Sequence, residues 1–271
     1  MKSPRDLLFY IACGSLILLM LAAIFAPFIS PRDPLEQNLQ ARFSPPGQNG
    51  YILGSDNFGR DVLSRIIYGS RSALTVGLVA VSIAVTIGTT VGLCAGLGRP
   101  RVDNTLMLLM DSILSFPTIL LAITVVSFLG YGLVQVMVAL GIIYSPVFAR
   151  LVRAETLAIK TEGYVEASRS LGSGPLKIVF KHIMPNLLGR IVVQCSITFA
   201  LALVVEASLS YLGLGTQPPN PSWGLMLKDA RNYLSQAPWM AIYPGLVLAF
   251  TVLFFNILGD FFAERLNPKL N

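Results

Sequence analysis

Long apolar runs recur along the whole chain and are separated by shorter polar segments. A membrane-spanning helix needs about 20 predominantly apolar residues, and six runs meet or approach that length. They cover residues 7–29, 73–97, 104–129, 133–148, 188–212 and 240–262, of which the fourth is the shortest. The pattern predicts an all-α, polytopic membrane protein with six transmembrane helices.

One polar segment, residues 151–187, is too polar for a span and too regular for a linker. Five residues form a small, mostly apolar stripe at helical spacing: Tyr164, Val165, Ala167, Ser168 and Leu171. Gly172 is placed to end this helix, and Ser173 with Pro175 is a start signal for another. The segment is predicted to be a helix, a sharp turn and a second helix, presented to water where a soluble partner can bind it.

Basic residues predict the orientation, because positively charged loops stay in the cytoplasm. With a cytoplasmic N-terminus, the inner segments hold 13 of the 20 lysines and arginines. Both termini and segment 151–187 are therefore predicted to be cytoplasmic. The first span lacks a small-residue cleavage site and is interpreted as an uncleaved anchor. The net charge of +6 is explained by topology and anionic membrane lipids, so no nucleic-acid partner is expected.

Polar and helix-breaking residues inside the spans are candidates for a gate or a transport pathway. Asp111 lies about two turns from the cytoplasmic end of the third span, and Pro117 should kink that span. Glu206 is an intramembrane carboxylate of the fifth span. Kinks in static helices and polar contacts between helices are the alternatives for these residues.

Gly88, Gly92 and Gly96 recur at every fourth position of the second span and leave one helical face without side chains. Another helix can approach such a face closely. Packing inside the subunit and packing against a sister subunit both fit.

The segments outside the membrane contain two further patterns. Residues 53–69 predict a short external amphipathic helix, capped by Ser55 or Asp56, that lies at the membrane surface or on the bundle. The loop at 213–224 is rich in proline and glycine, and Trp223 and Trp239 suit the level of the lipid headgroups. This loop is a natural landing surface for cargo or for a docking protein.

The sequence has no phosphate-binding G-x-x-x-x-G-K-[ST] loop, hydrolase triad, zinc-spaced histidines or dinucleotide fingerprint. Its three cysteines share no metal-ligand spacing, and the single histidine, His182, is interpreted as a packing or interface residue. The chain is therefore expected to be no enzyme, and to bind no metal or cofactor. Any ATP must be handled by another polypeptide.

The segment E166-A-S-x-x-x-G172, followed by H-I-M-P185, resembles the signature of permease subunits of ATP-binding cassette (ABC) importers. It differs where Ser168 replaces the usual alanine and Met184 the usual leucine. The group that transports dipeptides, oligopeptides or nickel is the most similar, specifically its second permease. The supporting motifs are L-G-S-D-N-F-G-R-D-V-L-S-R-I-I-Y-G at 53–69, R-V-D at 101–103, F-P at 116–117, E-A-S-L-S-Y-L-G-L-G at 206–215 and P-P-N-P-S-W-G at 218–224.

The resemblance implies a type I importer fold in a bacterial inner membrane. Its implied partners are a homologous permease, two ATPase subunits that hold ATP and Mg²⁺, and an extracytoplasmic solute-binding protein. Segment 151–187 would dock a coupling helix on an ATPase: Ala167 and Ser168 allow close approach, Glu166 supplies a rim charge or caps the turn, and Gly172 permits the bend. The implied organisation is an anchor and external segment (1–72), a transmembrane domain (73–262) and a tail (263–271).

Two alternatives remain at this point. The first changes only the cargo, from di- or oligopeptides to nickel or a metal chelate. The second is a self-contained secondary carrier, which predicts several intramembrane charges and two related halves. Asp111 and Glu206 are the only strong interior candidates and no clear repeat is present, which disfavours a carrier.

Overall fold

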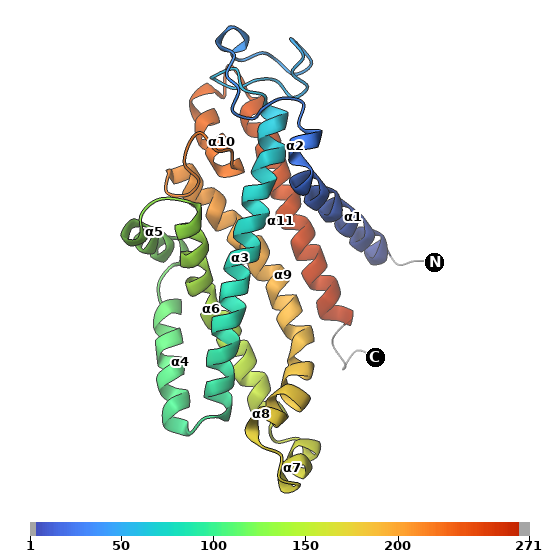
Figure 1. Ribbon diagram of the computed structural model, residues 1–271, viewed down its shortest axis with the longest axis vertical. Coiled ribbons are helices and arrows are strands. Elements are labelled where there is room, and N and C mark those ends of the chain that lie inside the picture. The colour runs from blue at the N-terminus through green and yellow to red at the C-terminus, as the bar shows by residue number, and fades with distance from the viewer. Residues whose placement is uncertain (1–3, 266–271) are drawn as a thin grey trace.

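The computed structural model describes residues 4–265, and nearly all of its regular structure is helical (Figure 1). The helices are α1 (Pro4–Ile24), α2 (Ala26–Ile29), α3 (Val62–Leu97), α4 (Pro100–Leu114), α5 (Thr118–Leu129), α6 (Leu133–Ile159), α7 (Gly163–Ser170), α8 (Pro175–Ile178), α9 (Met184–Leu212), α10 (Trp223–Ala230) and α11 (Trp239–Arg265). Short 3-10 turns lie at Leu39–Ala41 and Arg231–Tyr233, and a π-helical turn at Val179–Ile183 joins α8 to α9.

Five helical stretches of the described residues are long and apolar enough to cross a membrane, and a sixth span is obtained if the bent pair α4 and α5 counts as one. The predicted all-α, multi-span fold is confirmed. Two predicted boundaries are wrong. The second span begins at Val62 rather than at residue 73, and the fourth continues beyond residue 148 to Ile159. Both helices carry a polar extension that a hydropathy window does not detect.

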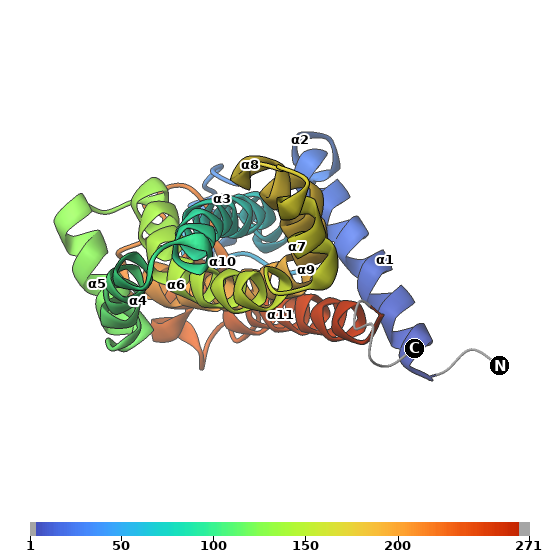
Figure 2. The same ribbon diagram turned by 90° about the horizontal axis from the view of Figure 1, so that it is seen from below.

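The bundle has two ends and two flanks. Helices α7 and α8 lie at one end of the bundle, which we call the α7 end (Figure 1). Helix α10 and the segment between α2 and α3 lie at the opposite end, which we call the α10 end. Seen along the bundle, α4 and α5 project on one flank and α1 on the opposite flank (Figure 2). An ion pair of 3.8 Å between Asp6 and Arg265 places the start of α1 beside the end of α11, so both helices reach the same side.

Helices α3 and α6 form the most extensive helix pair, and three glycines permit their close contact. A Cβ atom on Gly88 would lie 2.5 Å from the carbonyl oxygen of Ser145, and one on Gly92 would lie 2.6 Å from that of Ala149. A Cβ on Gly96 would meet the Thr156 side chain at 2.7 Å. The glycine face is therefore covered by α6 of the same chain, and only glycine fits at this separation.

The motif at 53–69 folds into a buried charge network at the α10 end rather than into a separate surface helix. Asp56 accepts from Arg60 Nε at 2.6 Å and lies 3.7 Å from Arg65, which is 1% exposed. Asp61, not the expected Ser55 or Asp56, caps the helix by accepting from the Ser64 amide at 2.8 Å. The amphipathic segment is thus the first part of α3, because its charged residues pair internally instead of facing water.

The two tryptophans near this end brace the same network. Trp223 is buried and donates its indole N–H to the Ile66 carbonyl at 3.1 Å, so the expectation that it lies among lipid headgroups is wrong. Trp239 is partly buried and donates to the Ser55 carbonyl at 3.1 Å. Trp223 therefore ties α10 to the start of α3, and Trp239 ties α11 to the loop that precedes α3.

Candidate functional sites: the α7 tip and the α4–α5 elbow

The patterned segment forms a compact tip at the α7 end. Helix α7 ends at Ser170, and Gly172 follows with a φ of +82°, in the left-handed region. The Ser173 amide donates to the Ser168 carbonyl at 3.1 Å and the Gly172 amide to the Arg169 carbonyl at 2.9 Å. These two bonds make a Schellman motif, as the glycine signal predicts. Helix α8 then begins with Pro175 at its first position, although its N-cap is Gly174 and not Ser173.

A polar cluster ties α7 to the beginning of α9. His182 Nε2 lies 3.2 Å from Ser168 Oγ, and the His182 ring lies 5.6 Å from that of Tyr164. Asn186 donates to the Tyr164 hydroxyl at 3.4 Å. His182 is therefore a packing residue, as its isolation in the sequence suggests. Ser168, expected to face a partner, is half-buried against His182.

The π-helical turn beneath the tip has a local cause in the sequence. The Met184 amide donates to the Val179 carbonyl, five residues back. The next residue is Pro185, which has no amide hydrogen and cannot make the usual α-helical hydrogen bond. Its ring also clashes with the carbonyl four residues earlier, which favours a locally widened helix. The tip is thus joined to α9 through a widened turn.

The tip exposes large apolar side chains to the surroundings. Leu171 is 87% exposed, and Leu176 and Phe180 are 72% and 69% exposed. By contrast, Val165 is buried and anchors α7 to the bundle. A cluster of exposed apolar residues in a polar segment is typical of a surface that a protein partner covers.

Glu166 and Ala167 complete the outward side of α7. Both are exposed, and the Glu166 side chain has no hydrogen bond or ion pair with any of residues 4–265. The turn after α7 is closed by backbone groups, so Glu166 does not cap it and stays available as a rim charge.

The second candidate site is the elbow at residues 115–117, where α4 and α5 meet at 94°. Pro117 is the N-cap of α5 and produces a full break rather than the expected kink. Near it, Asp111 accepts from Arg150 Nη2 of α6 at 2.6 Å, and both side chains are about half exposed. Asp111 lies ~16 Å along the axis of α4 from its start, at 1.5 Å per residue.

Exposed charges and broken backbone within a span cannot face lipid hydrocarbon, because neither is satisfied there. The flank that carries Asp111, Arg150 and the elbow must therefore be covered by another protein or by water. The sequence singles out Asp111 and Pro117 but gives no sign that Arg150 pairs with Asp111.

Sequence reasoning also missed a second ion pair between α4 and α6. Arg153 Nε and Nη2 donate to the two carboxylate oxygens of Asp103 at 2.5 and 2.7 Å. Asp103 is the acidic residue of the R-V-D motif at 101–103, and the motif alone does not indicate this ion pair. A bidentate arginine–carboxylate pair fixes both position and angle, so it holds α4 on α6.

Glu206 is not on this flank. It is 2% exposed and accepts from the Ser210 hydroxyl at 2.7 Å, within its own helix. The same hydroxyl accepts from the Thr216 amide at 3.0 Å. Glu206 therefore orients a hydroxyl that fastens the loop after α9. The contact thus lies within α9 and the loop that follows it, and is not the contact between helices given as the alternative.

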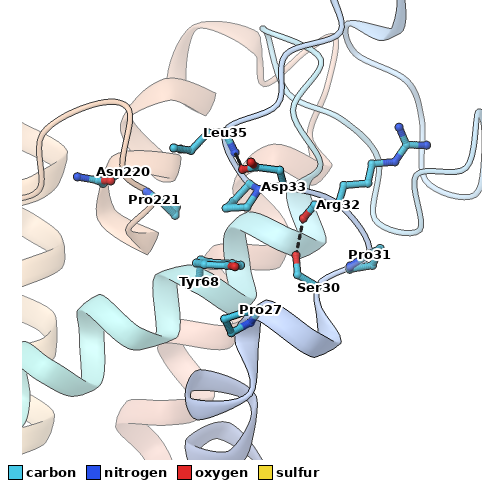
Figure 3. Close-up of a pocket in the computed structure, with 10 residues that line it drawn as sticks. Pro27, Ser30, Pro31, Arg32, Asp33, Leu35, Tyr68, Asn220 and Pro221 are labelled. Carbon is cyan, nitrogen blue, oxygen red and sulfur yellow. Dashed lines mark hydrogen bonds between the residues drawn. The ribbon is translucent and has the colours of Figure 1, made fainter.

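The α10 end contains a pocket of about 530 Å³ between α2, α3 and the loop before α10 (Figure 3). Its lining is rich in proline and includes Tyr68 and Asn220. Arg32 points away from Tyr68 and Asn220 (Figure 3), and its guanidinium lies 4.2 Å from the Tyr51 ring centroid. The pocket's one basic side chain is thus already engaged.

No metal-binding cluster of three or more His, Cys, Asp or Glu side chains is found among residues 4–265, and the three cysteines are free.

The chain thus combines a multi-span helical bundle with an exposed apolar tip at one end. Residues 84–271 match the family of binding-protein-dependent transport system inner membrane components. Residues 5–46 match the N-terminal transmembrane domain of oligopeptide transport permease C. The chain belongs to the family of inner membrane components of binding-protein-dependent transport systems.

Bacterial relatives match almost the whole chain. The di/tripeptide transport system permease protein DppC of Pseudomonas aeruginosa is 40% identical over 94% of this chain and 86% of its own length. The glutathione transport system permease protein GsiD of Pectobacterium atrosepticum is 42% identical over 96% of this chain and 87% of its own.

Among solved structures, an inward-facing conformation of the MetNI methionine ABC transporter gives a TM-score of 0.64 at 23% identity. It covers 76% of this chain and 97% of that chain. This likeness shows the fold alone: that of an ABC importer permease.

Proposed function

We propose that the chain is one of two permease subunits that form the translocation path of an ATP-driven importer of di- or oligopeptides. The observation that carries this proposal is the exposed apolar tip of a chain that belongs to an importer permease family. Leu171 and Phe180 leave water only when a partner covers them, and the ATPase subunits are the soluble partners of such a permease. Closure of two ATPases around ATP and Mg²⁺ would move the tip and, through α6 and α9, the spans.

The remaining surfaces fit the other expected partners. The α4–α5 flank, with the Asp111–Arg150 pair, suits the interface with a homologous permease and the aqueous path between the two. The α10 end suits an extracytoplasmic solute-binding protein. We therefore expect the α7 end and both termini to lie in the cytoplasm, as the distribution of basic residues predicts.

Short peptides are the cargo that the relatives favour, since they transport dipeptides, tripeptides or glutathione, itself a tripeptide. Nickel is not favoured by these names. A self-contained secondary carrier is ruled out by membership of a binding-protein-dependent family.

The tip is tested by the double variant Leu171→Ser/Phe180→Ser in the complete transporter. We expect the ATPase subunits to be lost from the purified complex and ATP-dependent peptide uptake to cease, while the chain still inserts. Phe28→Ser is the matched control, because Phe28 is 87% exposed but lies at the opposite end. Full ATPase recovery and uptake in the double variant would refute the tip as the coupling surface.

A further inference from the structure

A second, strongly polar pocket of about 420 Å³ lies at the α10 end. It is formed where the segment before α3, the end of α9, the end of α10 and the turn after α10 meet. Its lining residues are Asn57, Tyr211, Leu212, Lys228, Asp229, Arg231, Asn232 and Tyr233. A concave site of this size falls within the range of small-molecule sites.

The charges around this pocket do not cancel. Lys228 and Arg231 are exposed, and neither side chain makes a hydrogen bond or an ion pair within the described part of the chain. Asp229 is the acid of the lining, but it is held by Arg60 Nη2 at 3.4 Å. Its charge is thus already shared with a cation behind the pocket wall. The helix dipole favours cations at the end of α10, where both Lys228 and Arg231 lie. Lys228 and Arg231 outnumber the single lining acid, Asp229, so a net positive charge remains to attract an anion.

The pocket also holds an acceptor without a donor. Asn57 Oδ1 is buried and has no hydrogen-bond partner among residues 4–265. Buried acceptors are normally satisfied, because leaving one unpaired is costly. A ligand that brings an ammonium or amide N–H would satisfy it, while the hydroxyls of Tyr211 and Tyr233 can bond to peptide groups.

The position of the pocket relates it to the α4–α5 flank. The end of α9 continues to Leu214, whose carbonyl accepts from the Gly132 amide at 3.2 Å. Gly132 separates α5 from α6, so the pocket wall abuts the α10-side end of the flank assigned to the translocation path. A ligand that leaves this pocket is next to the entrance of that path.

We propose that this pocket is a transient binding site for the two charged termini of a free short peptide. Lys228 and Arg231 bind the C-terminal carboxylate, and Asn57 accepts from the N-terminal ammonium or the first amide. This inference rests on the proposed function and adds a recognition step between the binding protein and the path. A free peptide is favoured over an acidic side chain of the docked protein, because the pocket is concave and offers groups for both ends of a zwitterion.

The test uses the complete transporter in lipid nanodiscs without its binding protein. The probe is an alanyl dipeptide whose second side chain carries a diazirine, and its C-terminal amide serves as the uncharged counterpart. After irradiation, mass spectrometry should find labels at 211–212 and 232–233. The labelling yield should fall about tenfold for the amide, and equally for Lys228→Gln/Arg231→Gln, because each loses the charge-assisted contacts. Arg42→Gln, another exposed cation at this end, should label as the wild type does.

Equal labelling of the acid and the amide, or labels confined to other segments, would overturn the inference. So would a double variant that loses affinity for the binding protein yet labels normally, since the two cations would then serve docking. Uptake by the wild-type transporter with binding protein and ATP is measured in parallel. Absence of that uptake contradicts the proposed function, whereas normal uptake with charge-independent labelling contradicts only the pocket.

Discussion

Substitutions at Gly172 are expected to uncouple ATP hydrolysis from transport in a graded order, with asparagine mildest, alanine intermediate and valine most severe. The residue has a φ of +82°, and a Cβ added there would have no atom within 4 Å. The effect must therefore arise from the backbone conformation and not from a clash. Asparagine visits the left-handed region more readily than alanine, and a β-branched residue is strained there.

The magnitude follows from the cost of that conformation. A left-handed residue other than glycine costs roughly 1–2 kcal/mol, which lowers the population of the observed turn about 5- to 30-fold relative to alternative turns. The two Schellman hydrogen bonds and the contact between Ser168 and His182 oppose this loss. We therefore expect Gly172→Ala to reduce coupling several-fold, and Gly172→Val to abolish most of it.

The assay is the number of peptides taken up per ATP hydrolysed by the complete transporter in proteoliposomes, with subunit assembly checked by co-purification. Gly174→Ala is the matched control. Gly174 lies two residues away, its Cβ position is equally open, and its φ of −70° suits any residue. Coupling equal to wild type in Gly172→Val would refute the reasoning. So would a Gly174→Ala variant as impaired as Gly172→Ala.

Three further predictions concern stability. Gly92→Leu should separate α3 from α6 and cost at least about 2–3 kcal/mol through overpacking against Ala149, seen as lost thermal stability in detergent; an unchanged melting temperature would contradict the packing. A double-mutant cycle of Asp103→Asn and Arg153→Gln should give a coupling energy of about 1 kcal/mol, and additive effects would show that the pair contributes nothing. Burial raises the pKa of Asp229 above 3.8 despite its cationic neighbours. Because the folded state then holds its proton more tightly than the unfolded state, stability should fall as pH rises from about 4 through that pKa; Asp229→Asn should flatten this slope, and an unaltered slope would contradict it.

Much of the fold was predictable because lipid imposes a strong local rule on sequence. A span must be long and apolar, so hydropathy alone located the membrane segments and predicted the all-helical class. The tip was predictable for a similar reason, since the signals of Gly172 and Pro175 act over one helical turn. Helix boundaries were less accurate where polar ends extend a span, as in α3 and α6.

Only the tertiary structure shows which residues far apart in the chain contact one another. The sequence could not show that Arg65 is buried beside Asp56 or that Arg150 pairs with Asp111. Nor could it show that Asn57 and Arg231 line one pocket. The length of an apolar segment and the residues that form a turn depend on neighbours in the sequence, so they can be predicted from the sequence alone. Charge pairing, the sharing of a pocket and the face on which a glycine stripe packs depend on how helices distant in sequence meet.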